Sequence, residues 1–326
     1  MNTTMTRFKY FVLASLIVMG LVQPQVHAQA PAPAMGQPIR IVVPYAAGGL
    51  VDATARIVAQ RMGQSLHQAV IIENRAGGNA NIGPTVVIQA PADGRTLLAT
   101  GNFFINNPLL ENNLAWNPKK FVPIGRYATA MSALVVPKNS KANTVAELVT
   151  LAKNGPSLPV VYNGPGNSQT LTQEALQKLG GFKFMPVQYR GGTTYVTDLV
   201  TGRLEAGVVP LNVAQGLIRN GDVKALAIVA SERSLLFPNV PTLAEAGFGD
   251  ATFESWLGFH ALQGTDPEII SRIARALEET MLDPDVRAKL TNMGALSAYL
   301  PAAEFESFLQ LDRLRTANSM GIKLRD

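Results

Sequence analysis

A short apolar strand, a glycine-containing turn and an amphipathic helix follow one another several times along this chain. In the first such unit the strand Ile39 to Val43 leads into the turn Tyr45-Ala46-Ala47-Gly48-Gly49, and a helix begins near Leu50. Apolar residues recur at helical spacing after Leu50, which predicts a helix with one buried face. Apolar strands are expected again at 69–72 and 96–100. This β-α-β-α-β order predicts an α/β fold with a mostly parallel sheet covered by helices on both faces.

The middle and the end of the chain repeat the same kinds of element. Thr144 with Glu147 forms a capping box, which predicts the start of a helix. A second box, Thr265 with Glu268, predicts the start of another, with Pro267 in its first turn. Further strands are expected at 133–136, 160–162, 185–189, 206–209, 225–229 and 253–262. Further helices are expected at 170–179, 193–201, 284–293 and 302–320.

Two groups of strands of similar order predict two α/β lobes, each with a mostly parallel sheet flanked by helices. Lobe one is expected to be discontinuous, with residues 38–134 and 258–326, and lobe two to comprise residues 135–257. Residues 29–37 are rich in Ala, Pro and Gln and predict a flexible linker before lobe one. A ligand cleft is expected between the lobes.

Residues 1–28 have the pattern of a secretory signal peptide. Arg7 and Lys9 precede the apolar run Tyr10 to Val22, and Val26-His27-Ala28 fits the site that a signal peptidase reads. The alternative is a membrane anchor, but the apolar run is shorter than the roughly 20 residues that a spanning helix needs. We therefore expect cleavage after Ala28 and a periplasmic mature protein.

Composition excludes several classes of function. Loss of Arg7 and Lys9 with the signal peptide lowers the formal net charge from +5 to +3, which is too small an excess to indicate nucleic-acid binding. The chain has no cysteine, so it has no thiolate nucleophile and no thiolate metal site. His67 and His260 lack a metal-spaced partner, and His260 lies in an apolar strand typical of a core histidine. No catalytic residue, metal or cofactor is therefore predicted.

The glycine turns indicate where a ligand would bind. In an open α/β sheet, ligands lie beyond the carboxyl ends of the strands, where the strand order reverses between the first and third strands. Those strands end in the Tyr45 to Gly49 turn and in Gly101-Asn102-Phe103. Glycine allows backbone N–H groups to approach a ligand, and a helix N-terminus adds unsatisfied donors. Such a site suits an anion, and the absence of a Gly-Lys-Ser/Thr motif favours a carboxylate over a phosphate.

Several residues allow two interpretations from the sequence. Any single Gly-Gly pair is more often an ordinary tight turn, and only the coincidence of several at strand ends favours a binding site. Asp52 either complements the dipole of the helix that begins near Leu50 or belongs to the pocket. Arg190 either pairs with an anionic ligand or is a solvated loop residue. Trp116 and Trp256 are expected to serve packing or a hinge.

The motifs described so far resemble a known family, the receptors of tripartite tricarboxylate transporters, also called the Bug family. The matching stretches are IRIVVPYAAGGLVDATAR, VIIENRAGGNANIG, APADGRTLLATG, VQYRGGTTYVTDLVTGRLEAG, VKALAIVASERSLLFPNVPTLAEAGF and MGIKL. The resemblance implies a type II periplasmic-binding-protein fold, whose two lobes close on a small solute, commonly a carboxylate. It also implies delivery to a membrane permease with one large and one small subunit.

The resemblance transfers site positions onto this chain. In lobe one they are Tyr45 to Gly49 and Asp52, and in lobe two they are 166–170 and 189–193. Two stretches differ from the family pattern: Ala46-Ala47 replaces Pro-Pro, and Thr170 stands where relatives commonly have His.

We predict a periplasmic receptor for a small organic acid, without enzymatic activity and monomeric. One carboxylate would bind to the Tyr45 to Gly49 turn. The predicted ligand contacts elsewhere are Asp52, Asn102, Phe103, Asn167, Ser168, Thr170, Arg190, Gly191, Thr193 and Pro210. An exported hydrolase or lyase acting through Asp52 or Glu174 is the alternative, as is a module that signals to a membrane sensor.

Overall fold

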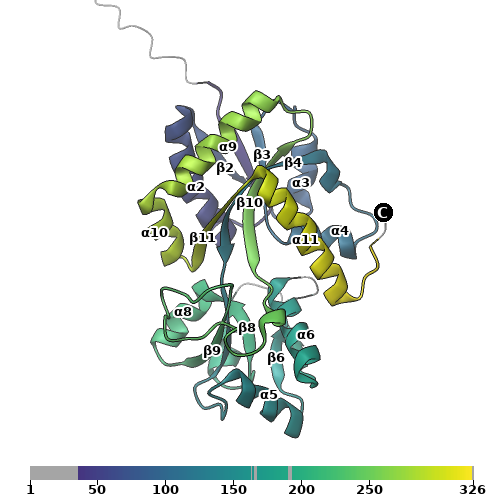
Figure 1. Ribbon diagram of the computed structural model, residues 1–326, viewed down its shortest axis with the longest axis vertical. Helices are drawn as coiled ribbons and strands as arrows, with labels where there is room; N and C mark the ends of the chain where they lie inside the picture. Colours follow the sequence, from purple (N-terminus) through teal and green to yellow (C-terminus); the bar gives the residue numbers. More distant parts are fainter. Residues whose placement is uncertain (1–35, 163, 165–166, 190–192, 325–326) are drawn as a thin grey trace, which may run out of the picture. The chain divides into compact units, whose positions relative to one another are not determined.

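Three β-sheets organise the part of the chain that the structure describes. The computed structural model describes residues 36–324 except 163, 165–166 and 190–192 (Figure 1). The predicted signal peptide and most of the predicted linker therefore lie outside the described residues, as do Arg190 and Gly191. The strands are β1 (Ile39–Val43), β2 (Val70–Asn74), β3 (Thr96–Thr100), β4 (Phe121–Ala130), β5 (Ser132–Pro137), β6 (Pro159–Tyr162), β7 (Met185–Gln188), β8 (Gly207–Pro210), β9 (Val223–Val229), β10 (Ser255–Leu262) and β11 (Ala295–Pro301).

Helices connect most of these strands. The α-helices are α2 (Leu50–Leu66), α3 (Ile82–Ile88), α4 (Phe103–Leu110), α5 (Val145–Asn154), α6 (Ser168–Gly180), α7 (Val196–Val200), α8 (Leu211–Arg219), α9 (Pro267–Leu282), α10 (Pro284–Asn292) and α11 (Ala302–Met320). Short 3-10 helices are η1 (Pro118–Lys120) and η2 (Gly249–Ala251). Within the described ranges, no helix combines the length and apolar character needed to cross a bilayer.

The largest sheet has six strands in the order β11-β4-β10-β3-β1-β2. β1 lies parallel to both β2 and β3, which is the order that places a switch point between the first and third strands. β10 runs antiparallel to β3 and β4, and β11 runs antiparallel to β4. The prediction of a mostly parallel sheet is therefore wrong for this half of the sheet. The reason is that β4 leads out of the sheet and β10 returns to it, so these neighbours run in opposite directions.

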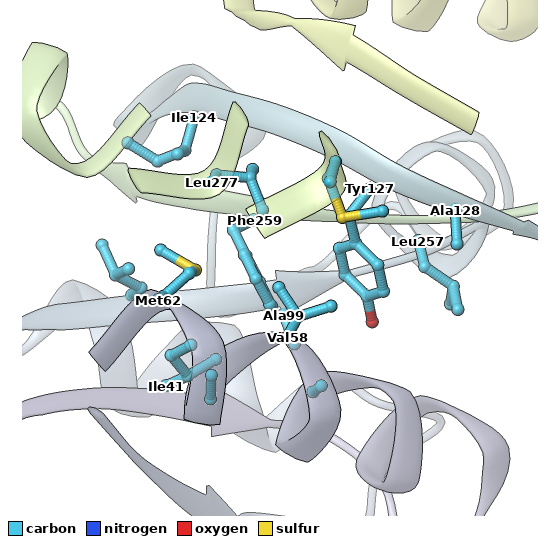
Figure 2. Packing of buried hydrophobic residues seen from close by; sticks show 14 of the residues in the cluster. Ile41, Val58, Met62, Ala99, Ile124, Tyr127, Ala128, Leu257, Phe259 and Leu277 are labelled. Atoms are coloured by element: carbon cyan, nitrogen blue, oxygen red, sulfur yellow. The ribbon is translucent and has the colours of Figure 1, made fainter. Parts of the chain in front are cut away.

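Side chains that alternate along the strands bury both faces of the six-stranded sheet. Ile41 and Val43 point into a cluster beneath α2, α9 and α10, whereas Val42 points into a second cluster beneath α3, α4 and α11. Figure 2 shows part of the first cluster, where Met62 of α2 and Leu277 of α9 pack around Phe259 of β10. A strand buried on both faces is continuously apolar, which explains why β1 and β3 were recognisable from the sequence.

The remaining strands form a smaller mixed arrangement. β5 lies between β8 and β9 and is antiparallel to both, so here too the predicted mostly parallel sheet is wrong. β6 pairs in parallel with β7, and a single bridge from Val160 to Ala206 joins β6 to the residue before β8. Leu134 of β5 packs into one apolar cluster and Val135 into another, so this sheet is also covered on both faces.

The chain changes sheet at Met131, between β4 and β5, and again between β9 and β10. The Met131 N–H donates to the Gly294 carbonyl oxygen at 3.2 Å, and the Met131 carbonyl accepts from the Leu211 N–H at 2.9 Å. This residue therefore links the loop before β11 to the start of α8. The division into lobes at 38–134, 135–257 and 258–326 stays a prediction.

Among the described strands and α-helices, four were not predicted, namely α4, β4, α8 and β11. Pro123 and Gly125 interrupt the apolar pattern of β4, which is nevertheless held between β10 and β11. The predicted capping box at Thr144 is confirmed, because its Oγ1 accepts from the Glu147 N–H at 3.1 Å. The cap predicted for Thr265 is wrong: Asp266 caps α9, and its carboxylate accepts from the Glu268 N–H at 2.8 Å.

Candidate functional site

A cavity of about 540 Å³ lies at the carboxyl ends of β1 and β3 and also contacts residues of the smaller sheet. It is the place that the strand order predicts. Its lining comprises Tyr45, Gly48, Gly49, Leu50, Val51, Asn79, Gly101, Asn102, Phe103, Asn106, Asn107, Ala130, Met131, Asn167, Ser168, Gln169, Thr193, Pro210, Asn212, Val213, Ser255, Trp256 and Leu257. Both chain crossings, at Met131 and at the start of β10, thus lie on its wall.

The first residues of four helices meet at this cavity. Leu50 and Val51 begin α2, and Phe103 begins α4. Ser168 begins α6, and Asn212 is the second residue of α8. Helix N-termini leave backbone N–H groups without intrahelical acceptors and carry the positive end of the helix dipole. Their convergence gives the cavity a positive character without requiring a cation.

No charged side chain lines the cavity among the residues that the structure describes. Its polar side chains are amides and hydroxyls, such as those of Asn107, Gln169 and Ser255. The predicted contacts Arg190 and Gly191 lie outside the described residues. Within the described lining, negative charge on a ligand can therefore be stabilised only by neutral donors and by helix dipoles.

The turn between β1 and α2 differs in detail from the expected cradle. Gly48 adopts a left-handed backbone conformation with φ of 82°, and its N–H donates to Oδ2 of Asp52 at 2.9 Å. The Gly49 N–H faces the Ala46 carbonyl oxygen at 3.4 Å. The Gly48 N–H is therefore not available to a ligand. Ala46 and Ala47 are exposed and lie outside the cavity lining.

The next two amides are donors at the cavity. Leu50 and Val51 line the cavity, and neither N–H has a hydrogen-bond acceptor within the described part of the chain. The sequence predicted that a carboxylate binds to the Tyr45 to Gly49 turn, and of the amides there the Gly48 N–H is already paired with Asp52. The helix start expected near Leu50 already indicated unsatisfied donors, since helix geometry leaves the first amides without partners.

Asp52 lies behind the turn and does not line the cavity. Its side chain is buried, and Oδ1 accepts hydrogen bonds from Asn74 Nδ2 at 2.9 Å and contacts Arg56 Nη2 at 2.9 Å. Burial opposes its charge, but hydrogen bonds from Arg56, Gly48 and Asn74 outweigh this effect and hold the pKa of the Asp52 carboxyl below its usual range. Neither Asp52 nor Glu174, the two residues considered for an enzyme, reaches the cavity lining.

Asn102 and Phe103 of the predicted site both line the cavity. The Asn102 side chain donates to the Glu254 carbonyl oxygen at 3.1 Å and accepts from the Trp256 N–H at 3.3 Å, so it joins the start of α4 to the start of β10. The ring of Phe103 packs edge-on against Tyr45, with 6.0 Å between ring centroids. These two side chains therefore shape the wall, and the Asn102 amide already has partners within the protein.

The predicted residues around α6 have distinct positions. Asn167 caps α6, because its Oδ1 accepts from the Thr170 N–H at 2.9 Å. Ser168 Oγ lies 2.6 Å from Ser255 Oγ, which joins α6 to β10 across the cavity wall. Thr170 is buried and does not line the cavity, whereas Thr193 and Pro210 do. The Thr170 N–H is therefore used by the cap, and its side chain is buried.

Several lining residues were not predicted. Asn79 and Asn107 come from the loop before α3 and from α4, and Asn107 Nδ2 donates to the Asn79 carbonyl at 2.7 Å. Asn212 follows Pro210 directly at the end of a predicted strand. Its position was visible in the sequence, but the helix α8 that orients it was not predicted. Trp256 also lines the cavity and is buried in an apolar cluster, as its packing interpretation predicts; a role at a hinge stays a prediction.

His260 is a core residue, as predicted. It is buried against Phe104 and Phe305, and its Nδ1 lies 2.9 Å from Thr100 Oγ1. Burial lowers the pKa of its imidazole to about 3. The described residues contain no group of three or more His, Cys, Asp or Glu side chains placed to hold a metal ion.

Known proteins share this architecture. A family model described as "Tripartite tricarboxylate transporter family receptor" matches residues 54–320. A UPF0065 protein in the tcbD-tcbE intergenic region of Pseudomonas sp. (strain P51) is 33% identical over 266 residues, which cover 80% of this chain and 79% of that protein. The solved structure of R. palustris Rpa4515 with adipate matches with a TM-score of 0.78 and 26% identity, over 88% of this chain and 98% of that one.

A second solved structure, MatC from Rhodopseudomonas palustris with bound malate, matches with a TM-score of 0.72 and 27% identity, over 88% of this chain and 99% of that one. These matches confirm the α/β fold of the periplasmic-binding-protein type. They also confirm the family resemblance seen in the glycine-turn motifs. The chain therefore belongs to the tripartite tricarboxylate transporter receptor family of periplasmic solute-binding proteins, and it is a receptor rather than an enzyme.

Proposed function

We propose that this receptor captures a small organic acid in the cavity at the ends of β1 and β3 and delivers it to the membrane permease of a tripartite transporter. The observation that carries the proposal is the convergence of four helix N-termini on a cavity whose described lining has no charged side chain. One carboxylate of the ligand accepts hydrogen bonds from the N–H groups of Leu50 and Val51. The remainder of the ligand lies toward α6 and α8.

Neutral donors are sufficient for useful affinity. A hydrogen bond to a charged group contributes about 1.5–3 kcal/mol, and a micromolar complex requires about 8 kcal/mol. Four or five such bonds supply much of that free energy before the cost of ordering the ligand. The converging helix dipoles add to it, because their positive ends point at the bound anion.

The size of the cavity fits a small molecule, and the relatives favour a carboxylate. About 540 Å³ falls within the range of about 300–1,000 Å³ that is typical of small-molecule sites. Rpa4515 was solved with adipate and MatC with malate, which are both dicarboxylates. A phosphate ligand is disfavoured because the turn after β1 lacks the Lys-Ser or Lys-Thr of a phosphate-binding loop.

Membership of the family, rather than the cavity, supports delivery to a permease. The Ser168–Ser255 contact and the Met131 hydrogen bonds connect elements on both sides of the cavity, so ligand binding there is placed to alter the outer surface that a permease recognises. The signal peptide expected at residues 1–28 would bring the protein to the periplasm, where such a permease takes up its substrate.

Calorimetric titration of the purified protein tests the proposal. Adipate and malate are the first ligands, followed by longer dicarboxylates, tricarboxylates and aromatic acids. The matched control is adipamide, which has the length of adipate without its charge. We expect at least one acid to bind in the micromolar range and adipamide to bind far more weakly. The proposal would be overturned if neutral solutes bound and none of the acids did.

A further inference from the structure

We propose that Asp52 is a positioning residue for the ligand rather than a contact: it holds the β1–α2 turn so that the N–H groups of Leu50 and Val51 face the cavity. The inference rests on the proposed function, since it explains how the anion-binding amides are oriented. Asp52 is itself absent from the cavity lining.

The polar groups that the described structure places against the Asp52 carboxylate are hydrogen-bond donors. Oδ2 accepts from the Gly48 N–H at 2.9 Å and from Arg56 Nε at 3.1 Å. Oδ1 accepts from Asn74 Nδ2 at 2.9 Å and lies 2.9 Å from Arg56 Nη2. Only a carboxylate offers acceptors to all of them, because an amide would turn its NH₂ group toward another donor. The site therefore requires a carboxylate at position 52, and a side chain of the same size without two acceptor oxygens would not replace it.

Asn74 extends this arrangement to the other end of the turn. Its Nδ2 also donates to the Tyr45 carbonyl oxygen at 3.1 Å, and its Oδ1 accepts from Arg56 Nη2 at 3.0 Å. Asn74 is the last residue of β2 and pairs in register with Val43, the last residue of β1. The Asp52–Asn74 pair therefore fastens the turn at Tyr45 and at Gly48 to the edge of the six-stranded sheet.

The same contacts neutralise the negative charge of Asp52 at the turn. A free carboxylate beside an anion site would repel the ligand, but Asp52 is paired with Arg56 one helical turn away. The Arg56 side chain is half exposed, so its charge neutralises Asp52 without entering the cavity. The ligand consequently meets the amides and dipole of α2 rather than an unpaired negative charge.

The isosteric variant Asp52→Asn tests the inference. Amide hydrogen exchange, measured by NMR without ligand, reports on the Gly48 N–H, and calorimetry with adipate reports on the oriented amides. We expect exchange at Gly48 to accelerate by about tenfold or more and the adipate affinity to fall by about tenfold or more, since a buried charge-assisted network is broken. Unchanged exchange at Gly48, or an adipate affinity within about twofold of wild type, would overturn the inference.

Two control variants separate positioning from general effects. Asp285→Asn makes the same change in an exposed ion pair on α10. Asp285 lies 2.7 Å from Lys289, four residues further along, as Asp52 pairs with Arg56. This variant should change neither the exchange at Gly48 nor the adipate affinity. Ile273→Ala destabilises the core at a residue that does not line the cavity and should leave adipate affinity unchanged. An equal loss of affinity in Ile273→Ala would show that Asp52 acts through stability alone. If wild type binds no acid, the proposed function fails, and exchange at Gly48 still decides the role of Asp52.

Discussion

The indole Nε1 of Trp256 donates a hydrogen bond to Oδ2 of Asp312 at 3.0 Å. Trp256 lines the cavity from the start of β10, whereas Asp312 belongs to α11, the last helix of the chain. Burial raises the pKa of the Asp312 carboxyl, although the hydrogen bond from Trp256 and the nearby Arg315 and Arg126 favour its charged form. The cavity wall thus depends on a carboxylate that folding makes harder to ionise.

Asp312→Asn should leave the protein at least as stable as wild type at neutral pH. The variant keeps an oxygen acceptor for Trp256 and removes the buried charge. Because the folded-state pKa of Asp312 lies above its unfolded value, wild type loses stability as pH rises from the unfolded toward the folded pKa. Urea unfolding of wild type and variant, at pH values below and above that range, measures the difference in their free energies of unfolding. Asp312→Leu is the contrasting variant, and we expect it to lose about 1–3 kcal/mol because the indole N–H has no acceptor.

Leu50→Pro should weaken acid binding by about tenfold to a hundredfold with little loss of stability. Proline removes one N–H from the cavity, and a hydrogen bond to a charged ligand contributes about 1.5–3 kcal/mol. The first helical position tolerates proline, and Gly49, with φ of −73° and ψ of 167°, already has the conformation that a residue before proline prefers. Leu50→Ala is the matched control, since it shortens the side chain and keeps the N–H. Equal affinities of the two variants would argue against an amide-based site.

His260 should make the stability of the protein depend on pH in the acid range. The imidazole has a pKa of about 3 in the folded protein and an ordinary value of 6.5 in the unfolded chain, so the unfolded chain takes up the proton first. Stability from this residue is complete above about pH 6.5 and falls toward pH 3 by up to about 1.4 kcal/mol per pH unit. In urea unfolding across this range, the free energy of unfolding of His260→Phe should depend less steeply on pH than that of wild type. The difference in slope corresponds to the uptake of one proton. Identical slopes for variant and wild type would contradict the assignment.

Gly258→Ala should destabilise the fold by about 1–3 kcal/mol or more through overpacking. A Cβ at this position of β10 would lie 2.6 Å from the ring of Phe305 and 2.9 Å from the Gly125 carbonyl oxygen. Gly216→Ala on α8 is the control, because its Cβ would meet nothing within 4 Å and alanine favours a helix. Thermal unfolding of both variants makes the comparison, and a melting temperature unchanged in Gly258→Ala would show that Phe305 moves aside freely.

Local patterns were sufficient to predict much of the fold and the region of the site. The strand 96–100 and the cap at Thr144 were predicted correctly, because an apolar run and a capping box act within a few residues. The order of the first three strands then located the cavity at the turn after β1 and at Gly101 to Phe103.

The pairing of distant groups could not be read from such patterns. β4 is interrupted by Pro123 and Gly125 and is a strand because β10 and β11 flank it. The chain direction in each sheet likewise depends on where β4 leaves and β10 returns.

The sequence by itself determined the family, the alternation of strands and helices, and a glycine turn beside the cavity, since these depend on residues close together in the chain. Only the tertiary structure decided which amides of that turn remain free. Asn74, at the far end of β2, meets Asp52 at 2.9 Å, and the Asp52 carboxylate takes the Gly48 N–H. A backbone donor binds whichever acceptor the fold brings within about 3 Å, and that acceptor is set by packing rather than by local sequence.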